Sequence, residues 1–237
     1  MMTERRADDL LMIAARAPVA GATKTRLGNA IGMDKAATLY RAFLHDLAAR
    51  FDRDDHGFDL AWTYSPPECD FRSELEAVTG VGSRSARFVP QSGPDWGARQ
   101  LNLLRWGADQ GYRRMILMAS DSPQLPVSLI ESGFALLHER EIVLGRVQDG
   151  GYYLIGERGF HDVLSSVAMS TASAADDVVA RSRDQGLTVG ELPMTFDVDE
   201  RPDLDELIAT LRADPALCPA SWDALRQLGL EPTSVSD

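Results

Sequence analysis

Short apolar runs alternate with helical patterns along almost the whole chain, and this alternation constrains the fold more than any other feature. The runs that predict strands lie at residues 10–15, 58–65, 85–91, 113–120 and 187–198. The segments with apolar residues at helical spacing lie at residues 33–51, 96–110, 126–139, 172–185 and 201–213. Such alternation predicts a largely parallel sheet with helices on both faces. We therefore expect an α/β fold with three layers, in the order α/β/α.

One segment interrupts the alternation. Two β-rich runs, 141–147 and 151–157, flank the sequence Gln-Asp-Gly at 148–150. Asp-Gly between apolar runs is a strong signal for a β-hairpin. We expect a tight turn there, with positive φ at Gly150 and Gly151.

Single residues mark several of the expected boundaries. Asp95 is suited to be the N-cap of the helix at 96–110, and Gly186 is suited to end the helix at 172–185. Pro193 cannot donate to a sheet ladder, so the last strand is expected at an edge or with a bulge.

Length and composition bound the class of protein. The 237 residues contain no repeat or linker-like shift, so we expect one domain over 1–237, with a core at about 10–213 and a loose C-terminal tail. The chain is 44% hydrophobic and 25% charged, as ordinary globular proteins are. Its net charge is −12, from 24 Lys and Arg against 36 Asp and Glu. This field opposes binding to nucleic acid or to anionic lipid.

The sequence also predicts a cytoplasmic location. Cys69 and Cys218 lie far apart without metal-type spacing, which fits a reducing compartment. The polar N-terminus lacks the apolar segment of a secretion signal. No apolar run approaches the roughly 20 residues that a membrane span needs. We expect no nucleic-acid or membrane partner.

A basic stretch follows the first expected strand, at the sheet edge where open α/β folds bind ligands. Its sequence, ARAPVAGATKTRL at residues 15–27, lacks the Walker A and dinucleotide-binding patterns. Gly21 permits a tight approach of the backbone, and Lys24 and Arg26 lie on the same side if the stretch is extended. Backbone N–H groups and two cations can hold a diphosphate. The alternative is a solvated turn whose basic residues pair with surface carboxylates.

Three aspartates near two other strand ends could supply a metal site. Asp121 follows the strand at 113–120, and Mg²⁺ or Mn²⁺ usually binds one or two carboxylates plus substrate phosphates. Asp197 and Asp199 are two residues apart, so in an extended segment they face the same way. The structural alternatives are a local turn for Asp121 and capping of the next helix for the other two.

The expected hairpin turn could serve an acceptor substrate. Asp149 could orient or deprotonate an acceptor hydroxyl, and the bare backbone of Gly150 and Gly151 could lie against a sugar. A turn with a purely structural role is the alternative.

Four motifs, APVAGATKTRL, ASDSPQL, VLGRVQDGGYYLIG and FDVDERPDL, occur in this order over about residues 11–207. Together they resemble a bacterial family of GT-A-like transferases associated with arsenosugar biosynthesis or with radical-SAM and selenoprotein gene neighbourhoods. The family is more distantly similar to 2-phospholactate and molybdenum-cofactor guanylyltransferases.

The resemblance implies a Rossmann-like fold of the nucleotide-diphospho-sugar transferase type, with Mg²⁺ or Mn²⁺ as cofactor. It implies a nucleotide-activated donor and a small-molecule acceptor as binding partners. The predicted site residues are Pro18, Gly21, Lys24, Thr25, Arg26 and Gln91 for the nucleotide, Asp121, Asp199 and Asp197 for the metal, and Asp149, Gly150 and Gly151 for the acceptor, with Asp149 and Lys24 as catalytic residues.

The chain departs from the family pattern at a few positions. The sequence PDWGAR stands where G-D-L-G-E-R is frequent, so Trp96 and Ala98 replace Leu and Glu. The second change weakens any catalytic role for a glutamate there. Arg146 replaces the usual proline after VLG, and Ser122 stands where Cys is frequent. Arg146 could alter the choice of acceptor, or it could be a solvated residue at a strand end.

The sequence leaves three functions open. The first is a metal-dependent glycosyltransferase, in which the cation, Lys24 and Arg26 stabilise the departing nucleoside diphosphate. The second is a nucleotidyltransferase, in which an acceptor attacks the α-phosphate of a nucleoside triphosphate. The third is a nucleotide-binding protein without turnover. We expect the first.

Overall fold

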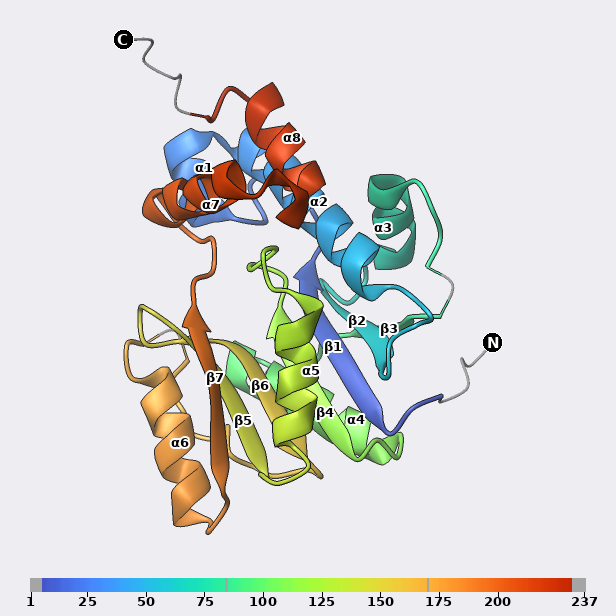
Figure 1. Ribbon diagram of the computed structural model, residues 1–237, viewed down its shortest axis with the longest axis vertical. Coiled ribbons are helices and arrows are strands. Elements are labelled where there is room, and N and C mark those ends of the chain that lie inside the picture. Colours follow the sequence, from blue (N-terminus) through green and yellow to red (C-terminus); the bar gives the residue numbers. More distant parts are fainter. Residues whose placement is uncertain (1–5, 84, 170, 232–237) are drawn as a thin grey trace.

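The computed structural model describes residues 6–83, 85–169 and 171–231, and within them seven strands form one sheet in the order β3-β2-β1-β4-β6-β5-β7 (Figure 1). The strands are β1 (Asp9–Arg16), β2 (Asp59–Ser65), β3 (Arg87–Pro90), β4 (Arg114–Ala119), β5 (Ile142–Val147), β6 (Tyr152–Arg158) and β7 (Val189–Thr195). All neighbouring strands pair in parallel except β6, which is antiparallel to both β4 and β5.

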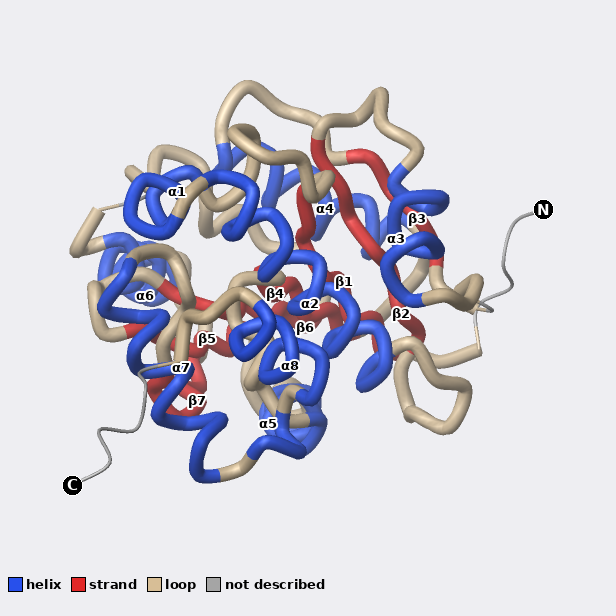
Figure 2. The backbone as a smooth tube through the Cα atoms, turned by 90° about the horizontal axis from the view of Figure 1, so that it is seen from above, coloured by secondary structure: helices blue, strands red, loops and turns tan. Residues whose placement is uncertain are grey.

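Helices cover both faces of the sheet, which gives the expected three layers (Figure 2). One face packs against α2 (Met33–Phe51), α3 (Phe71–Thr79) and α5 (Val127–Leu136). The helices α7 (Arg201–Ala213) and α8 (Pro219–Gln227) belong to the same core, and α8 packs on α2. The other face packs against α4 (Trp96–Asp109) and α6 (Ala174–Asp184). The short helix α1 (Thr25–Ile31) contacts α2 and α7.

The central strands are apolar on both faces because both faces are covered. Leu10 and Met12 of β1 enter the core on the side of α4, whereas Leu11 and Ile13 enter the core on the side of α2. This explains why residues 10–15 form an unbroken apolar run rather than an alternating one. The α/β fold class is confirmed.

The predicted hairpin is confirmed, because β5 and β6 pair in antiparallel register around the turn at 148–150. The turn differs in detail, since only Gly150 has positive φ, at 90°, and Gly151 does not. The expectation for Pro193 is also confirmed: β7 is an edge strand, and its register with β5 shifts between Gly145 and Val147.

The core extends beyond residue 213, which corrects the predicted core of about 10–213. Ala224 and Leu225 of α8 are buried against α2, and the buried Asp46 caps α8 by accepting from the backbone N–H groups of Ala220 and Ser221 at 2.9 and 2.8 Å. The rest of the predicted loose tail, residues 232–237, lies outside the described residues. The single domain over 1–237 stays a prediction.

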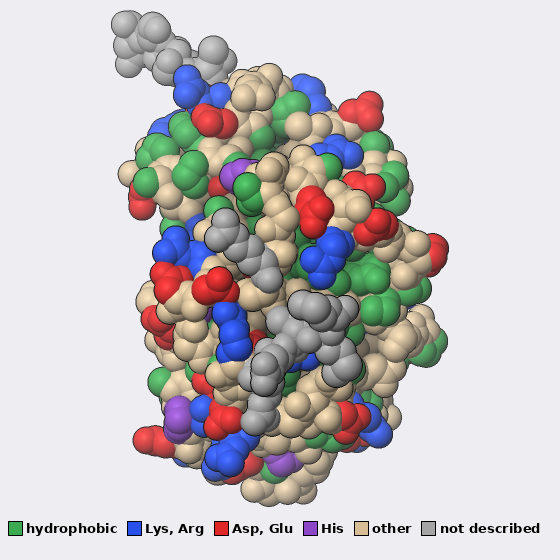
Figure 3. Space-filling model, turned by 90° about the vertical axis from the view of Figure 1, so that its right-hand side faces the viewer, with side chains coloured by type: hydrophobic (Ala, Val, Ile, Leu, Met, Phe, Trp, Pro, Cys, Tyr) green, Lys and Arg blue, Asp and Glu red, His purple; other side chains and the backbone are tan. Residues whose placement is uncertain are grey.

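The apolar character of the helices and the charges on the surface relate to the predicted absence of membrane and nucleic-acid partners. Within the described segments, no helix has the length and apolar character required to cross a bilayer. On the face that carries α3 and β3, acidic and basic side chains are interspersed (Figure 3).

Glu157 of β6 is an ionisable group inside the core. Its side chain is inaccessible to solvent, and it accepts a hydrogen bond from the His161 backbone N–H at 3.0 Å. The other carboxyl oxygen has no partner among the described residues. Burial raises the pKa of Glu157 to about 8, with a smaller contribution from the charge of Asp162. The carboxyl group is therefore protonated in the folded protein at neutral pH.

We predict that Glu157→Gln stabilises the protein increasingly as pH rises from about 4.5 to 8. In this window Glu157 ionises in the unfolded state but not in the folded state, which lowers the free energy of the unfolded state alone. The contribution of Glu157 to wild-type stability therefore falls as pH rises, and the variant lacks this loss. The difference should reach roughly a few kcal/mol. Urea unfolding of both proteins at pH 5 and pH 8.5 measures it, and an equal difference at both pH values would contradict the assignment.

Candidate functional site

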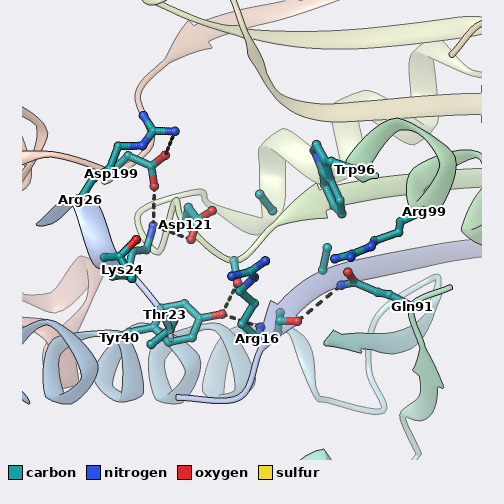
Figure 4. Close-up of a pocket in the computed structure, with 15 residues that line it drawn as sticks. Arg16, Thr23, Lys24, Arg26, Tyr40, Gln91, Trp96, Arg99, Asp121 and Asp199 are labelled. Atoms are coloured by element: carbon teal, nitrogen blue, oxygen red, sulfur yellow. Dashed lines mark hydrogen bonds and ion pairs between the residues drawn. The ribbon is translucent and has the colours of Figure 1, made fainter. Parts of the chain in front are cut away.

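A cavity of about 290 Å³ opens beyond the carboxyl ends of β1 and β4 (Figure 4). This is the edge at which open α/β sheets bind ligands. The cavity is lined by Ala14, Ala15, Arg16, Thr23, Lys24, Thr25, Arg26, Tyr40, Gln91, Trp96, Arg99, Ala119, Ser120, Asp121 and Asp199. Six of the predicted site residues therefore meet here, from segments that are far apart in the sequence.

The buried ammonium group of Lys24 is the centre of the cavity wall. Its Nζ lies 2.5 Å from Asp121 Oδ1 and 3.0 Å from Asp199 Oδ1, and it donates to the Val198 carbonyl at 2.7 Å. The side chain is only 4% exposed. Burial alone lowers the pKa of Lys24, but the attraction of Asp121 and Asp199 outweighs burial and raises it. The ammonium therefore stays charged.

The local backbone directs Lys24 inward. The segment after β1 turns tightly, with the N–H groups of Ala22 and Thr23 both donating to the Val19 carbonyl. Lys24 then adopts a left-handed conformation, with φ 49° and ψ 43°, and α1 begins at the next residue. A non-glycine residue in this region is uncommon and marks a constrained position. The basic stretch is thus a turn followed by a helix rather than an extended loop.

Arg26 lies one residue into α1 and on the outer side of Asp199. Its guanidinium is 3.7 Å from Asp199 and 3.6 Å from Glu200, and its side chain is 61% exposed. Burial of Asp199 opposes ionisation, but the charge and hydrogen bond of Lys24 together with Arg26 lower its pKa. Asp199 therefore remains a carboxylate shared by two cations.

The segment that carries Asp199 is fixed to the end of β4. The Phe196 carbonyl accepts hydrogen bonds from Ser122 Oγ at 3.1 Å and Gln124 Nε2 at 2.7 Å, and the Val198 N–H donates to the Asp121 carbonyl at 2.9 Å. Ser122, which departs from the family pattern, is therefore buried and has a structural role through this hydrogen bond.

A capping box holds the other side of the same segment. The Asp203 carboxylate accepts from the backbone N–H groups of Asp199 and Glu200 at 3.0 and 2.7 Å. Glu200 and Asp203 thus cap α7, and the Asp199 side chain is free of this role and accepts a hydrogen bond from Lys24.

The far end of the cavity is polar and partly aromatic. Gln91 is buried and its Nε2 donates to the carbonyl groups of Thr63 and Ala15 at 3.1 and 3.4 Å. Trp96 and Arg99, from the first turn of α4, lie opposite Gln91, with the Arg99 guanidinium directed toward it (Figure 4). Both are half-buried. A flat ring and a cation next to an amide are suited to a nucleoside.

Some predicted nucleotide-binding residues lie outside the cavity wall. Pro18 is buried in the turn after β1, and Gly21 is exposed at its tip with φ 77°. Neither belongs to the cavity lining, whereas Thr25 does.

The structure adds lining residues that the sequence did not single out. Arg16 was visible within the basic stretch, and Trp96 and Arg99 stand within PDWGAR, the segment that departs from the family pattern. Tyr40 had no functional signal because its helical spacing indicates core. It links the cavity to α2, since its hydroxyl accepts from the Arg16 N–H at 2.9 Å and bonds Ser120 Oγ at 2.7 Å.

A second hollow, of about 390 Å³, shares Arg26 and Asp199 with the first. It is lined by Arg26, Gln148, Asp149, Phe196, Asp197, Asp199, Glu200, Asp203 and Glu206. Burial, followed by repulsion from Asp199 and Asp121, raises the pKa of Asp197 to about 6. Asp197 lies in this hollow and outside the lining of the first cavity. Of the three aspartates predicted to bind the metal, Asp121 and Asp199 therefore meet at Lys24.

The hairpin turn has a structural role as well as a place at the second hollow. The exposed Asp149 carboxylate accepts from the Gly151 N–H at 2.9 Å, which closes the turn. Gly150 is required by packing, because a Cβ there would overlap the Ala172 carbonyl oxygen. The face of Gly150 predicted to meet a sugar is thus covered by the segment before α6. Arg146 is paired with Asp176 and Glu191 on the surface.

The residues present fit a divalent cation that a substrate helps to hold. Asp121 and Asp199 converge on one point, occupied by the Lys24 ammonium. Among residues 6–83, 85–169 and 171–231, no three or more His, Cys, Asp or Glu side chains form a group able to bind a metal by themselves. Mg²⁺ commonly binds through one or two carboxylates plus substrate phosphates, which is the donor set that this edge offers.

Comparisons with known proteins identify the family of the chain and its fold. Residues 53–171 match the family described as "Uncharacterized protein conserved in bacteria (DUF2064)", and the chain belongs to this family. A crystal structure of a protein from Desulfovibrio desulfuricans G20, provisionally named a nucleotide-diphospho-sugar transferase, is similar over 95% of this chain and 96% of that one. The identity is 31% and the TM-score 0.86. No curated protein matches.

More distant structures share the fold alone. A cytidylyltransferase from Leptospira borgpetersenii has 12% identity and a TM-score of 0.51, and covers 96% of each chain. A 4-diphosphocytidyl-2C-methyl-D-erythritol synthase from Anaerococcus prevotii has 9% identity and a TM-score of 0.54, with 86% of this chain and 97% of that one covered. The chain thus has the fold of nucleotide-diphospho-sugar transferases, and the similarity at 31% identity supports a transferase that uses a nucleotide.

We predict that Gly150→Ala destabilises the protein more than Gly21→Ala does. Both residues have positive φ, so each substitution carries roughly 1–3 kcal/mol of backbone strain. Only at position 150 does the new methyl group meet other atoms, which adds roughly 1–3 kcal/mol of overpacking. Thermal unfolding of the two variants tests this, and equal losses would show that the Ala172 contact does not require glycine.

Proposed function

We propose that the protein transfers a sugar from a nucleoside-diphosphate sugar to a small acceptor, with Mg²⁺ or Mn²⁺ as cofactor. The observation that supports this most is the position of the two cavities on either side of Arg26 and Asp199, which line both. The first offers Gln91, Trp96 and Arg99 to a nucleoside, and the second lies beyond Asp199, where a group attached to the diphosphate would extend.

The charge of the second hollow favours a sugar over a phosphorylated acceptor. Carboxylates dominate its lining, with Arg26 as the cation on its border with the first cavity. Carboxylates accept hydrogen bonds from sugar and acceptor hydroxyls, but they repel a phosphate group. This favours glycosyl transfer over a nucleotidyl transfer to an acceptor phosphate.

The proposed reaction uses the residues on both sides of Asp199. An acceptor hydroxyl oxygen forms a bond to the anomeric carbon of the donor, and the bond between that carbon and the β-phosphate oxygen breaks. Asp149 takes the proton of the hydroxyl, and the nucleoside diphosphate leaves with the electron pair. Lys24 and Arg26 stabilise the charge on the leaving diphosphate.

Asp121 and Asp199 would hold the cation, which when bound supplies Lewis-acid stabilisation of phosphate charge. Asp197 is less suited to this role, because it faces the second hollow. A shift toward its neutral form makes Asp197 suited to a hydrogen bond with a hydroxyl group there.

Donor class can be tested by thermal shift in Mn²⁺. UDP- or GDP-sugars should raise the unfolding temperature more than the matching triphosphates do, because a ligand that binds the native state stabilises it. A donor at about 100 times its Kd stabilises by about 2.7 kcal/mol. With an acceptor panel, release of nucleoside diphosphate supports the proposal. Pyrophosphate release from GTP or CTP would overturn it in favour of nucleotidyl transfer, and binding without turnover would indicate a non-catalytic protein.

We predict that Asp121→Ala abolishes metal-dependent nucleotide binding and leaves the fold intact. The variant removes one of two carboxylates at the proposed cation position, while Lys24 keeps Asp199 and the Val198 carbonyl. Residues that only contact the ligands of a metal typically contribute 10- to 100-fold to metal affinity. Loss of a direct ligand should therefore weaken nucleotide binding in Mn²⁺ by about 100-fold or more. Calorimetric titration of UDP and GDP in Mn²⁺ measures it. Asp176→Ala, at a 74% exposed side chain paired with Arg146, is the control. Unchanged affinity in Asp121→Ala would refute the metal assignment.

A further inference from the structure

The hydrogen-bonding capacity of Lys24 is fully used within the protein. An ammonium group has three N–H donors, and here three acceptors surround it: Asp121 Oδ1, Asp199 Oδ1 and the Val198 carbonyl. With its side chain only 4% exposed, the ammonium has no donor left for a phosphate in this arrangement. Lys24 must change partners before it can bind a diphosphate.

The same ammonium occupies the position between the two carboxylates that a cation would need. Asp121 and Asp199 are each about a third exposed on the cavity side, so an ion arriving from the cavity can reach them. A divalent cation and a lysine ammonium repel each other at such a distance. Only one of them can lie between the carboxylates.

Displacing Lys24 on its own is unfavourable. The displaced ammonium would remain in a largely buried position without a counter-charge, which is costly. A diphosphate in the first cavity would remove this cost by accepting the ammonium's hydrogen bonds. Val19 and Gly21, in the turn before Lys24, are exposed, so the main-chain segment that precedes it faces solvent on one side.

We propose that Lys24 is a built-in counter-ion that occupies the cation's place until a nucleotide diphosphate arrives, so that cation and nucleotide bind as a pair. This rests on the proposed function, because it takes a divalent cation and a nucleotide diphosphate as ligands. The coupling is reciprocal: each ligand raises the affinity for the other through the same exchange of partners by Lys24. In the unliganded site the ammonium balances one of the two carboxylate charges and lies where a free cation would bind.

The test is calorimetric titration of Mn²⁺ without nucleotide, on wild type and Lys24→Met. Removal of an active-site lysine should tighten the binding of Mn²⁺ alone, by about 5- to 150-fold, the usual range of coupling between two ligands. In the presence of UDP or GDP the gain should shrink, because in wild type the diphosphate already draws Lys24 away. Lys24→Gln, which keeps N–H donors for the Val198 carbonyl, repeats the measurement if Lys24→Met does not fold.

Arg26→Met is the matched control. It also removes one positive charge within 4 Å of Asp199, but its guanidinium is solvent-exposed and does not lie between the carboxylates. Its effect on Mn²⁺ alone should be small, because exposed charges are screened. Tightening of equal size in both variants would show a general charge effect and overturn the proposal.

Failure of this proposal is distinguishable from failure of the proposed function. If wild type binds Mn²⁺ together with UDP or GDP but Lys24→Met binds Mn²⁺ alone no more tightly than wild type, only the role of Lys24 is wrong. If wild type binds neither nucleotide in Mn²⁺, both proposals are overturned. A larger rise in unfolding temperature on adding Mn²⁺ to Lys24→Met than to wild type supports the counter-ion role independently.

Discussion

The buried ion cluster of Lys24, Asp121 and Asp199 is the interaction on which the arrangement of the site depends. It joins the segment after β1 to the segment after β4 and to the segment before α7. A buried lysine needs its partners to stay charged, and the two carboxylates need a cation to lie so close together. The cluster therefore fixes three separate segments at one point and leaves a charged centre between two cavities.

The rest of the site follows from how the sheet supports that centre. The parallel strands β1 and β4 end side by side, so the segments that follow them share one edge. Hydrogen bonds donated by Ser122 and Gln124, and one accepted by the Asp203 carboxylate, then hold the segment with Asp199 in place without using its side chain. The proposed nucleoside, phosphate and acceptor positions thus lie along one edge of the sheet, with the ion cluster in the middle.

The sequence predicted the strands and long helices because their apolar periodicity is local. It also predicted which strand ends bear charged residues, since the α/β rule specifies the edge. It could not predict that Lys24 faces inward, because that depends on a left-handed backbone at a non-glycine residue. Nor could it predict α8, whose cap is Asp46, more than 170 residues earlier. The sequence did not predict Tyr40 and Arg99 as cavity residues for a related reason: packing between elements decides which side chains line the cavity.

The reversed direction of β6 has a consequence for how such a protein can diversify. Because β6 runs against its neighbours, the hairpin turn with Asp149 lies at the same edge as the ends of the parallel strands. The proposed acceptor side is therefore built partly from a short turn between two strands, whereas the proposed nucleotide side is built from the segments after β1 and β3. The two halves lie on separate segments, so side chains around the second hollow other than Asp149 and Gly150 can be replaced while the segments that would bind the activated donor are retained.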